Sequence, residues 1–136
     1  MTRALLDTNV ILDFMLARPP FADAAAQVME AHRAGRFEAF ISPITPVNVF
    51  YVARKLGARR ARAALEQILT EFEITLIDLA LLRAAFLLPI PDYEDAVQAV
   101  CAITEDADFI VTRDPKDFKN SPVKAISPAE FLQELG

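Results

Sequence analysis

Acidic side chains at three distant places in the sequence are the residues best suited to chemistry. Asp7 ends an apolar run, Asp92 and Asp95 lie at the start of a helical pattern, and Asp114 and Asp117 follow a second apolar run. Carboxylates that converge from separate segments supply the oxygen ligands that divalent cations such as Mg²⁺ and Mn²⁺ prefer. A cation held there would lower the pKa of a bound water and polarise a phosphoryl oxygen, so the predicted chemistry is phosphodiester hydrolysis.

Each of these acids also has an ordinary structural interpretation. Asp7 stands at a strand–helix junction, where many aspartates cap a helix or form a turn. Asp92 lies three residues before Asp95 and could cap the same helix, and both acids favour the positive end of the helix dipole. Asp114 precedes a proline, a pair that is typical of turns. The coincidence of all of them at the ends of separate elements indicates a shared site.

Other catalytic chemistries find little support in the composition. The chain holds one histidine and one cysteine, which excludes a zinc-binding pattern, and no serine has the flanking glycines of a nucleophile elbow. Only three glycines occur, so there is no glycine-rich phosphate loop. We expect His32 to be solvated at a polar helix end and Cys101 to be a buried structural thiol. A phosphatase that forms a phosphoenzyme would place a second acid two residues after Asp7, where this chain has Asn9.

The size and composition indicate one globular domain over residues 1–136. A hydrophobic content of 54% excludes a disordered chain, and no apolar run is long enough to predict a membrane span. With a single cysteine and no signal-type segment, we expect a cytoplasmic protein. The net charge of -5 has the wrong sign for binding nucleic acid by bulk electrostatics. Bound divalent cations or a basic partner protein would offset that charge.

Strand and helix patterns alternate along the chain. Apolar runs of the strand type occur at residues 3–7, 38–42, 72–77, 109–112 and 123–126. Helical patterns occupy residues 9–16, 21–34, 47–56, 58–70, 79–88, 92–106 and 128–135. This alternation predicts an α/β fold, a three-layer α/β/α sandwich around a mostly parallel sheet of about five strands. Ligands bind at the C-terminal edge of such sheets, where we expect Asp7 and Asp114.

Three segments of the chain resemble the motifs of PIN domains. Residues 5–12 (LLDTNVIL) resemble the opening motif, and residues 92–99 (DYEDAVQA) and 109–118 (FIVTRDPKDF) resemble the later ones, in order and spacing over nearly the whole chain. The resemblance implies a parallel sheet between helices and a ribonuclease that depends on Mg²⁺ or Mn²⁺. It also implies the toxin of a VapBC-type toxin–antitoxin pair, with RNA as substrate, a cognate antitoxin as partner and a homodimeric assembly.

The resemblance assigns roles to individual residues. Asp7 would be the first metal-binding acid, Asp95 the third and Asp114 the fourth. Asp117 would be an accessory ligand or a substitute for Asp114. Asn9 would orient the site through its side-chain amide.

The chain departs from the family pattern at the second acid. That acid is usually a glutamate in a pattern like Ser-x-x-Thr-x-x-Glu, and residues 42–48 (SPITPVN) put Asn48 in its place. An amide oxygen can still coordinate a cation or hold a water bound to it, so Asn48 would be a weakened ligand in the second position. Because the amide carries no charge, it would weaken Mg²⁺ affinity and make a poor general base. Asp92 would compensate in part if the helix start reaches the site, and Thr112 would line the floor of the site. The alternative function is therefore a PIN domain that binds RNA or a protein without cleaving.

Basic residues gather at one place in this acidic chain: Arg54, Lys55, Arg59, Arg60 and Arg62. Such a run is commonly a solvated helix face. The other interpretation is that Arg59 and Arg60 contact RNA phosphates beside the acidic site. Arg113 and Lys116 bracket Asp114 and are placed to touch a scissile phosphate, or to pair with the acids.

One helical segment is more apolar than a single buried face requires. Residues 47–52 are apolar around much of the helix, with Phe50 near their centre. The pattern indicates a homodimer seam or a groove for an antitoxin helix.

Overall fold

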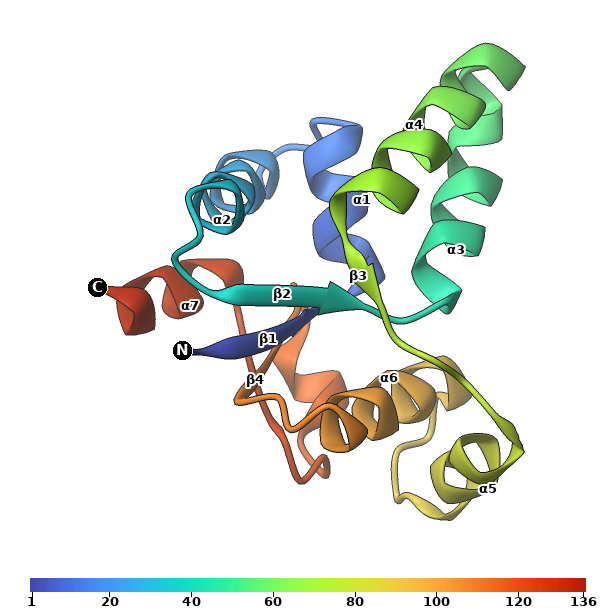
Figure 1. The fold of residues 1–136 in the computed structure, drawn as a ribbon, viewed down its shortest axis with the longest axis vertical. Coiled ribbons are helices and arrows are strands. Elements are labelled where there is room, and N and C mark those ends of the chain that lie inside the picture. The colour runs from blue at the N-terminus through green and yellow to red at the C-terminus, as the bar shows by residue number, and fades with distance from the viewer.

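A computed structural model describes all of residues 1–136 as a parallel sheet with helices on both faces (Figure 1). The strands are β1 (Arg3–Leu6), β2 (Glu38–Ile41), β3 (Glu73–Ile74), β4 (Phe109–Val111) and β5 (Lys124–Ile126). Their order across the sheet is β3-β2-β1-β4-β5, and every neighbouring pair is parallel. The C-terminal ends of all five strands therefore lie at one edge. The predicted α/β/α fold is confirmed.

Helices connect the strands and form the two outer layers. The α-helices are α1 (Thr8–Met15), α2 (Ala22–Arg33), α3 (Ile44–Ala53), α4 (Ala58–Glu71), α5 (Leu79–Leu87), α6 (Tyr93–Thr104) and α7 (Pro128–Leu135). Two 3₁₀ helices, η1 (Arg54–Leu56) and η2 (Pro115–Phe118), complete the chain. In Figure 1, α5 and α6 lie on one side of the sheet and the other α-helices on the opposite side, with α3 and α4 forming a hairpin that extends away from it. None of the helices combines the length and the apolar character needed to cross a membrane.

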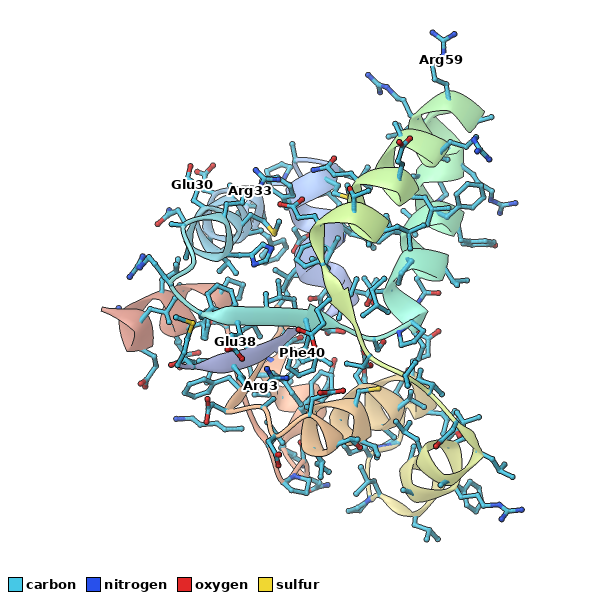
Figure 2. The ribbon with its side chains drawn as sticks, viewed as in Figure 1. Arg3, Glu30, Arg33, Glu38, Phe40 and Arg59 are labelled. Atoms are coloured by element: carbon cyan, nitrogen blue, oxygen red, sulfur yellow. The ribbon has the colours of Figure 1, made fainter.

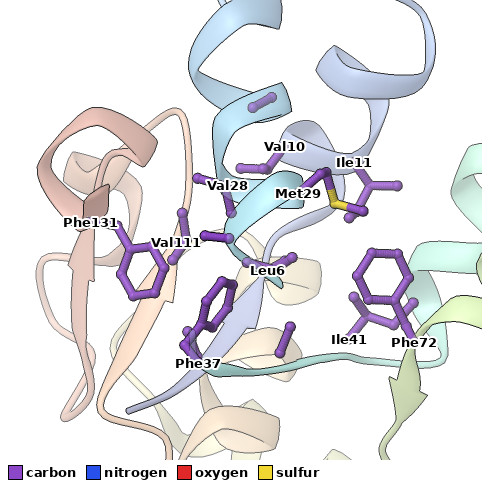
Figure 3. Packing of buried hydrophobic residues seen from close by; sticks show 14 of the residues in the cluster. Leu6, Val10, Ile11, Val28, Met29, Phe37, Ile41, Phe72, Val111 and Phe131 are labelled. Carbon is purple, nitrogen blue, oxygen red and sulfur yellow. The ribbon is translucent and has the colours of Figure 1, made fainter. Parts of the chain in front are cut away.

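The larger core lies between the sheet and the helices α1, α2 and α7. Figure 3 shows Leu6 from β1, Val28 from α2 and Phe131 from α7 packed together there, all fully buried. His32, which we expected to be solvated, instead stacks on Phe72 with 5.1 Å between ring centroids. Its ring covers the end of this core, so the histidine has a packing role.

The second core lies between the other face of the sheet and the helices α5 and α6. Because side chains alternate along a strand, β1 sends Leu5 into this core and Leu6 into the first one. The helix α6 is buried without interruption over Ala96–Ala102, which confirms that Cys101 is a buried thiol. Gln98 is the only amide or charged side chain in that buried run, and it is 2% exposed.

Two predicted elements differ from the structure by three residues at one end, and the others by no more than two. The predicted strand at 72–77 is reduced to Glu73–Ile74, because this edge strand pairs only with β2 and over only two residues. The helix predicted at 47–56 begins earlier, at Ile44, and its last turn tightens into η1. Pro46 is tolerated because it lies in the first turn, where a missing N–H breaks no helical hydrogen bond.

Helix caps fix where two helices begin. Asp7 caps α1, with its side chain accepting a hydrogen bond from the Thr8 N–H, so the cap stands one residue before the Thr8 or Asn9 that we expect from helix-start preferences. Ser127 caps α7, and its exchange of hydrogen bonds with Glu130 forms a capping box.

Candidate functional site

Asp7 lies at the junction of β1 and α1, at the C-terminal edge of the sheet. Its backbone N–H donates to the carbonyl of Val111 at the end of β4, at 2.9 Å, which joins the two central strands at this point. Its carboxylate is 7% exposed and accepts three hydrogen bonds. Oδ1 accepts from the Thr8 N–H (2.8 Å) and from Gln98 Nε2 (3.1 Å), and Oδ2 accepts from the Thr112 hydroxyl (2.8 Å). Asp7 is therefore both a helix cap and a tightly held carboxylate.

The surroundings of Asp7 disfavour its negative charge. Burial raises the pKa of the Asp7 carboxyl above its usual value, although the three hydrogen bonds act in the opposite direction. The nearby charge of Asp114 raises that pKa further. A bound cation would offset both effects.

Asp95 lies in the first turn of α6, where it is half-buried. Its backbone N–H donates to Asp92 Oδ1 at 3.0 Å, so Asp92 is the N-cap of this helix. Burial raises the pKa of Asp95 to about 7, and repulsion by Asp92, Asp7, Asp117 and Glu94 contributes in that order. The charges of acids on α6, at the β1–α1 junction and on η2 therefore all act on Asp95.

Asp114 and Asp117 come from the segment after β4. The predicted turn at Asp114 is the start of η2, and the Asp117 N–H donates to the Asp114 carbonyl at 3.0 Å. The Asp114 N–H donates to the Thr112 hydroxyl at 3.1 Å, and that same hydroxyl donates to Asp7. Thr112 is wholly buried. It therefore ties the backbone of the fourth acid to the carboxylate of the first.

Asn9 joins the start of α1 to the segment after β4. Its Oδ1 accepts from the Arg113 N–H at 3.2 Å, and its Nδ2 lies 3.5 Å from the Thr112 hydroxyl. These bonds hold the stretch of chain that leads to Asp114 against α1. Asn9 therefore has the geometry of an orienting residue.

The Arg113 side chain binds an acid that the sequence analysis missed. Its Nη1 lies 3.5 Å from Oδ1 of Asp13 on α1, and its guanidinium lies over the Phe21 ring, 4.3 Å from the ring centre. Asp13 is 1% exposed and also accepts from Arg18 Nε at 2.9 Å. The signal in the sequence was an acid inside the apolar pattern of the first helix, with an arginine five residues later.

A groove of about 510 Å³ runs beside Asp95. Its lining includes both acids and lysines: Pro89, Ile90, Pro91, Asp92, Asp95, Lys116, Asp117, Lys119 and Asn120. The Asn120 amide donates to the Pro89 carbonyl at 2.9 Å, which ties the η2 region to the α5–α6 loop. Lys116 therefore lies near the carboxylates, as its position in the sequence indicated, and Lys119 is a second cation that the sequence analysis did not single out.

Asn48, the residue in the place of the second acid, faces the start of α6. Its Nδ2 lies 3.5 Å from Oε1 of Glu94, a residue that the sequence analysis also missed. Glu38 cannot serve instead, because it pairs with Arg3 at the opposite edge of the sheet (Figure 2). An acid does stand beside the amide, but it comes from α6 and not from α3.

The basic cluster lies away from the acids. Figure 2 shows Arg59 at the tip of the α3–α4 hairpin, the end that points away from the sheet. Arg60 and the other members of the cluster are exposed on the same end. A helix of the length of α4, 14 residues, spans about 21 Å, so the structure does not bring Arg59 and Arg60 to the carboxylates.

The donor set at this edge of the sheet fits a hard divalent cation. All of its candidate ligands are oxygen atoms, and Asp7 and Asp95 have raised pKa values that a cation would lower. The side chains do not form a complete coordination sphere, because no three acids, histidines or cysteines stand close enough together to hold an ion. Mg²⁺ commonly completes its coordination sphere with water, which suits such a set.

Comparison with known proteins gives the family. A family model described as a PIN domain matches residues 3–116. No curated protein matches the chain. Among solved structures, VapBC2 from Rickettsia felis, bound to a DNA fragment from its promoter, is similar with a TM-score of 0.73 and 21% identity, over 93% of this chain and 98% of that one. A toxin–antitoxin complex from Klebsiella pneumoniae is similar with a TM-score of 0.73 and 25% identity, over 92% and 97% of the two chains. VapBC-1 from nontypeable Haemophilus influenzae has a TM-score of 0.67 at 18% identity, over 94% and 99%. Because the family model spans most of its length, this chain belongs to the PIN domain family.

Proposed function

We propose that the protein is a divalent-metal-dependent endoribonuclease that hydrolyses RNA phosphodiester bonds in the cytoplasm, as the toxin of a toxin–antitoxin pair. The observation that carries the proposal is the group of acids around Asp95, whose pKa is raised to about 7 by burial and by their repulsion. A divalent cation relieves such repulsion when it binds. Membership of the PIN family and the similarity to toxin–antitoxin complexes support the same function.

Carboxylates at the sheet edge would hold Mg²⁺ or Mn²⁺. The ligands in this proposal are Asp7, Asp95 and Asp114, with Asp117 as an accessory ligand. When bound, the cation supplies a water of lowered pKa and polarises a phosphoryl oxygen. Thr112 holds the Asp7 carboxylate and the Asp114 backbone in place through its one hydroxyl.

Lysines in the groove would contact the RNA backbone. Lys116 and Lys119 line the groove beside Asp95, so they can approach a phosphate close to the acids. Arg113 is paired with Asp13 through Nη1, so it would contact that phosphate through its remaining N–H groups or after leaving Asp13. Arg59 and Arg60 would contact only RNA that extends far beyond the scissile bond.

Apolar surface on the α3–α4 hairpin would form the interface with a partner. On α3, Val47 and Tyr51 are 68% and 62% exposed, as the apolar pattern of this helix predicted. A hollow beside it is lined by Val47, Phe50 and Leu69 together with other apolar residues. We propose that this surface contacts a cognate antitoxin or the second subunit of a homodimer.

A catalytically inactive PIN domain that binds RNA or a protein is the second candidate. The specific observation in its favour is Asn48, whose amide takes the place of the second acid. The Glu94 carboxylate beside Asn48 weakens the case for an inactive site, because Glu94 supplies a negative charge near the place of the second acid.

An RNA cleavage assay separates the two candidates. Purified protein is incubated with an end-labelled RNA pool in Mn²⁺, in Mg²⁺ and in EDTA, beside Asp7→Asn and Asn48→Glu. We expect the native chain to cut the RNA in Mn²⁺ or Mg²⁺. We expect no cutting in EDTA, and none by the Asp7→Asn variant in any condition. Cutting by Asn48→Glu alone would establish an inactive nuclease site and contradict the proposal.

A further inference from the structure

Gln98 is a polar side chain in a buried segment of α6 that packs in the second core. It lies in the buried run of α6 over Ala96–Ala102, and it is 2% exposed. Its Nε2 donates to Oδ1 of Asp7 at 3.1 Å, a contact between residues 91 positions apart in the chain. The reverse orientation of the amide would set Oε1 against the carboxylate, so the amide is oriented by Asp7.

The contact determines which oxygen of Asp7 is available. A carboxylate oxygen has room for about two donors. Oδ1 of Asp7 already accepts from the Thr8 N–H and from Gln98 Nε2, whereas Oδ2 accepts only from the Thr112 hydroxyl. One acceptor position is therefore left on Oδ2, and Gln98 closes the competing position on Oδ1.

The other end of the same amide has no partner. Oε1 of Gln98 is buried and accepts no hydrogen bond in the protein. A buried acceptor without a donor costs stability, and an apolar side chain of similar length would avoid that cost. Buried polar atoms of this kind commonly bind a water molecule.

We propose that Gln98 is a positioning residue of the metal site. Its Nε2 occupies Oδ1 of Asp7 and leaves Oδ2 to the cation, and its Oε1 accepts a hydrogen from a water that enters with the hydrated cation. The inference rests on the proposed function, because it assigns a role at the same site. It predicts that replacing Gln98 weakens cation binding more than it changes the stability of the cation-free fold.

The test measures Mn²⁺ affinity and cation-free melting temperature on the same variants. Mn²⁺ is titrated calorimetrically into the native chain, Gln98→Met and Gln98→Asn, with Asp7→Asn to identify the site. Gln98→Met keeps the length and removes both polar groups, and Gln98→Asn keeps the amide but is too short to reach Asp7. Val100→Ala is the matched control, because Val100 is buried on the same helix and packs in the second core.

We expect both Gln98 variants to weaken Mn²⁺ binding about 10-fold or more, as loss of a residue that orients a metal ligand does. Gln98→Met should melt near the native temperature, because it loses the hydrogen bond to Asp7 and the unpaired Oε1 together, and these two losses act in opposite directions. Val100→Ala should melt lower and bind Mn²⁺ as the native chain does. Native Mn²⁺ affinity in both Gln98 variants overturns the inference and leaves the proposed function intact. If Gln98→Met does not fold, Gln98→Asn decides. If Asp7→Asn binds Mn²⁺ as tightly as the native chain does, or if the native chain binds no Mn²⁺, the proposed metal site and this inference are both overturned.

Discussion

The guanidinium of Arg113 lies 3.5 Å from the carboxylate of Asp13, and the backbone N–H of the same arginine donates to Asn9. Both partners belong to α1, whose N-cap is Asp7. The segment that carries Asp114 is therefore fixed to the helix that carries the first acid. In the sequence, Arg113 was placed either to touch a scissile phosphate or to pair with the acids, and in the structure its side chain pairs with Asp13.

Replacing Asp13 by asparagine should destabilise the fold. The change removes the negative partner of Arg18 and Arg113 and weakens hydrogen bonds to charged groups, at a cost of about 2 kcal/mol in the free energy of unfolding. Urea denaturation of the native chain and the variant measures it. The exposed Asp23→Asn on α2 is the control and should stay within about 0.5 kcal/mol. Equal midpoints for native and Asp13→Asn would show that the Asp13 contacts contribute no stability.

Thr112 should tolerate serine but not valine. Its hydroxyl donates to Asp7 and accepts from the Asp114 N–H, and valine has the same shape without that hydroxyl. We expect Thr112→Val to weaken Mn²⁺ binding about 10-fold or more, and Thr112→Ser to restore most of the affinity. Calorimetric titration provides the comparison. Equal affinities for the two variants would mean that the hydroxyl does not organise the carboxylates.

Without a divalent cation, the contribution of Asp95 to stability should increase as the pH falls. The pKa of Asp95 is about 7 in the folded chain and 3.8 in the unfolded reference, so between these values the folded state binds the proton more tightly. The raised pKa of Asp7 acts in the same direction. Urea denaturation in EDTA should therefore show Asp95→Asn to be more stable than the native chain at pH 8, with the difference shrinking towards pH 5. A difference that does not change with pH would contradict the raised pKa.

Groove lysines and hairpin arginines should differ in their effect on a short RNA. Substituting Lys116 and Lys119 together by alanine should weaken binding and reduce the salt slope by up to about 0.7 for each lost phosphate contact. Substituting Arg59 and Arg60 together should change neither, because Arg59 lies at the far tip of the hairpin and Arg60 follows it in the first turn of α4. Fluorescence anisotropy over a salt series, with a single-stranded RNA of a few nucleotides, separates the two pairs. The opposite pattern would place the RNA on the hairpin.

The backbone framework of the site could be predicted from the sequence because it follows from local patterns. Apolar runs that end at Asp7 and before Asp114 indicated two strands, and parallel pairing places their ends at one edge. The start of α6 could be located from Asp92 and Asp95, since cap preferences depend on a few neighbouring residues.

Side-chain directions could not be predicted, because they depend on packing between distant elements. Arg113 bracketed Asp114 in the sequence, yet it binds Asp13, which only the docking of α1 beside β4 brings near. Gln98 stood in an apolar helical pattern as a single exception, and its partner Asp7 lies 91 positions away. The distance of Arg59 from the acids depends on the direction in which the α3–α4 hairpin extends. No local sequence pattern predicts that direction.

In the proposed function, Asp7, Asp95 and Asp114 form one metal-dependent site for cutting RNA. The decisive measurement is cleavage of an end-labelled RNA pool in Mn²⁺ by the native chain, by each Asp→Asn variant of these three acids and by the exposed Asp23→Asn control. We predict cutting by the native chain and the control, and a loss of about 100-fold or more in each of the three variants, because each removes charge from a site that stabilises the transition state by several kcal/mol. Native rates in Asp95→Asn or Asp114→Asn, or cutting that persists in EDTA, would contradict the account.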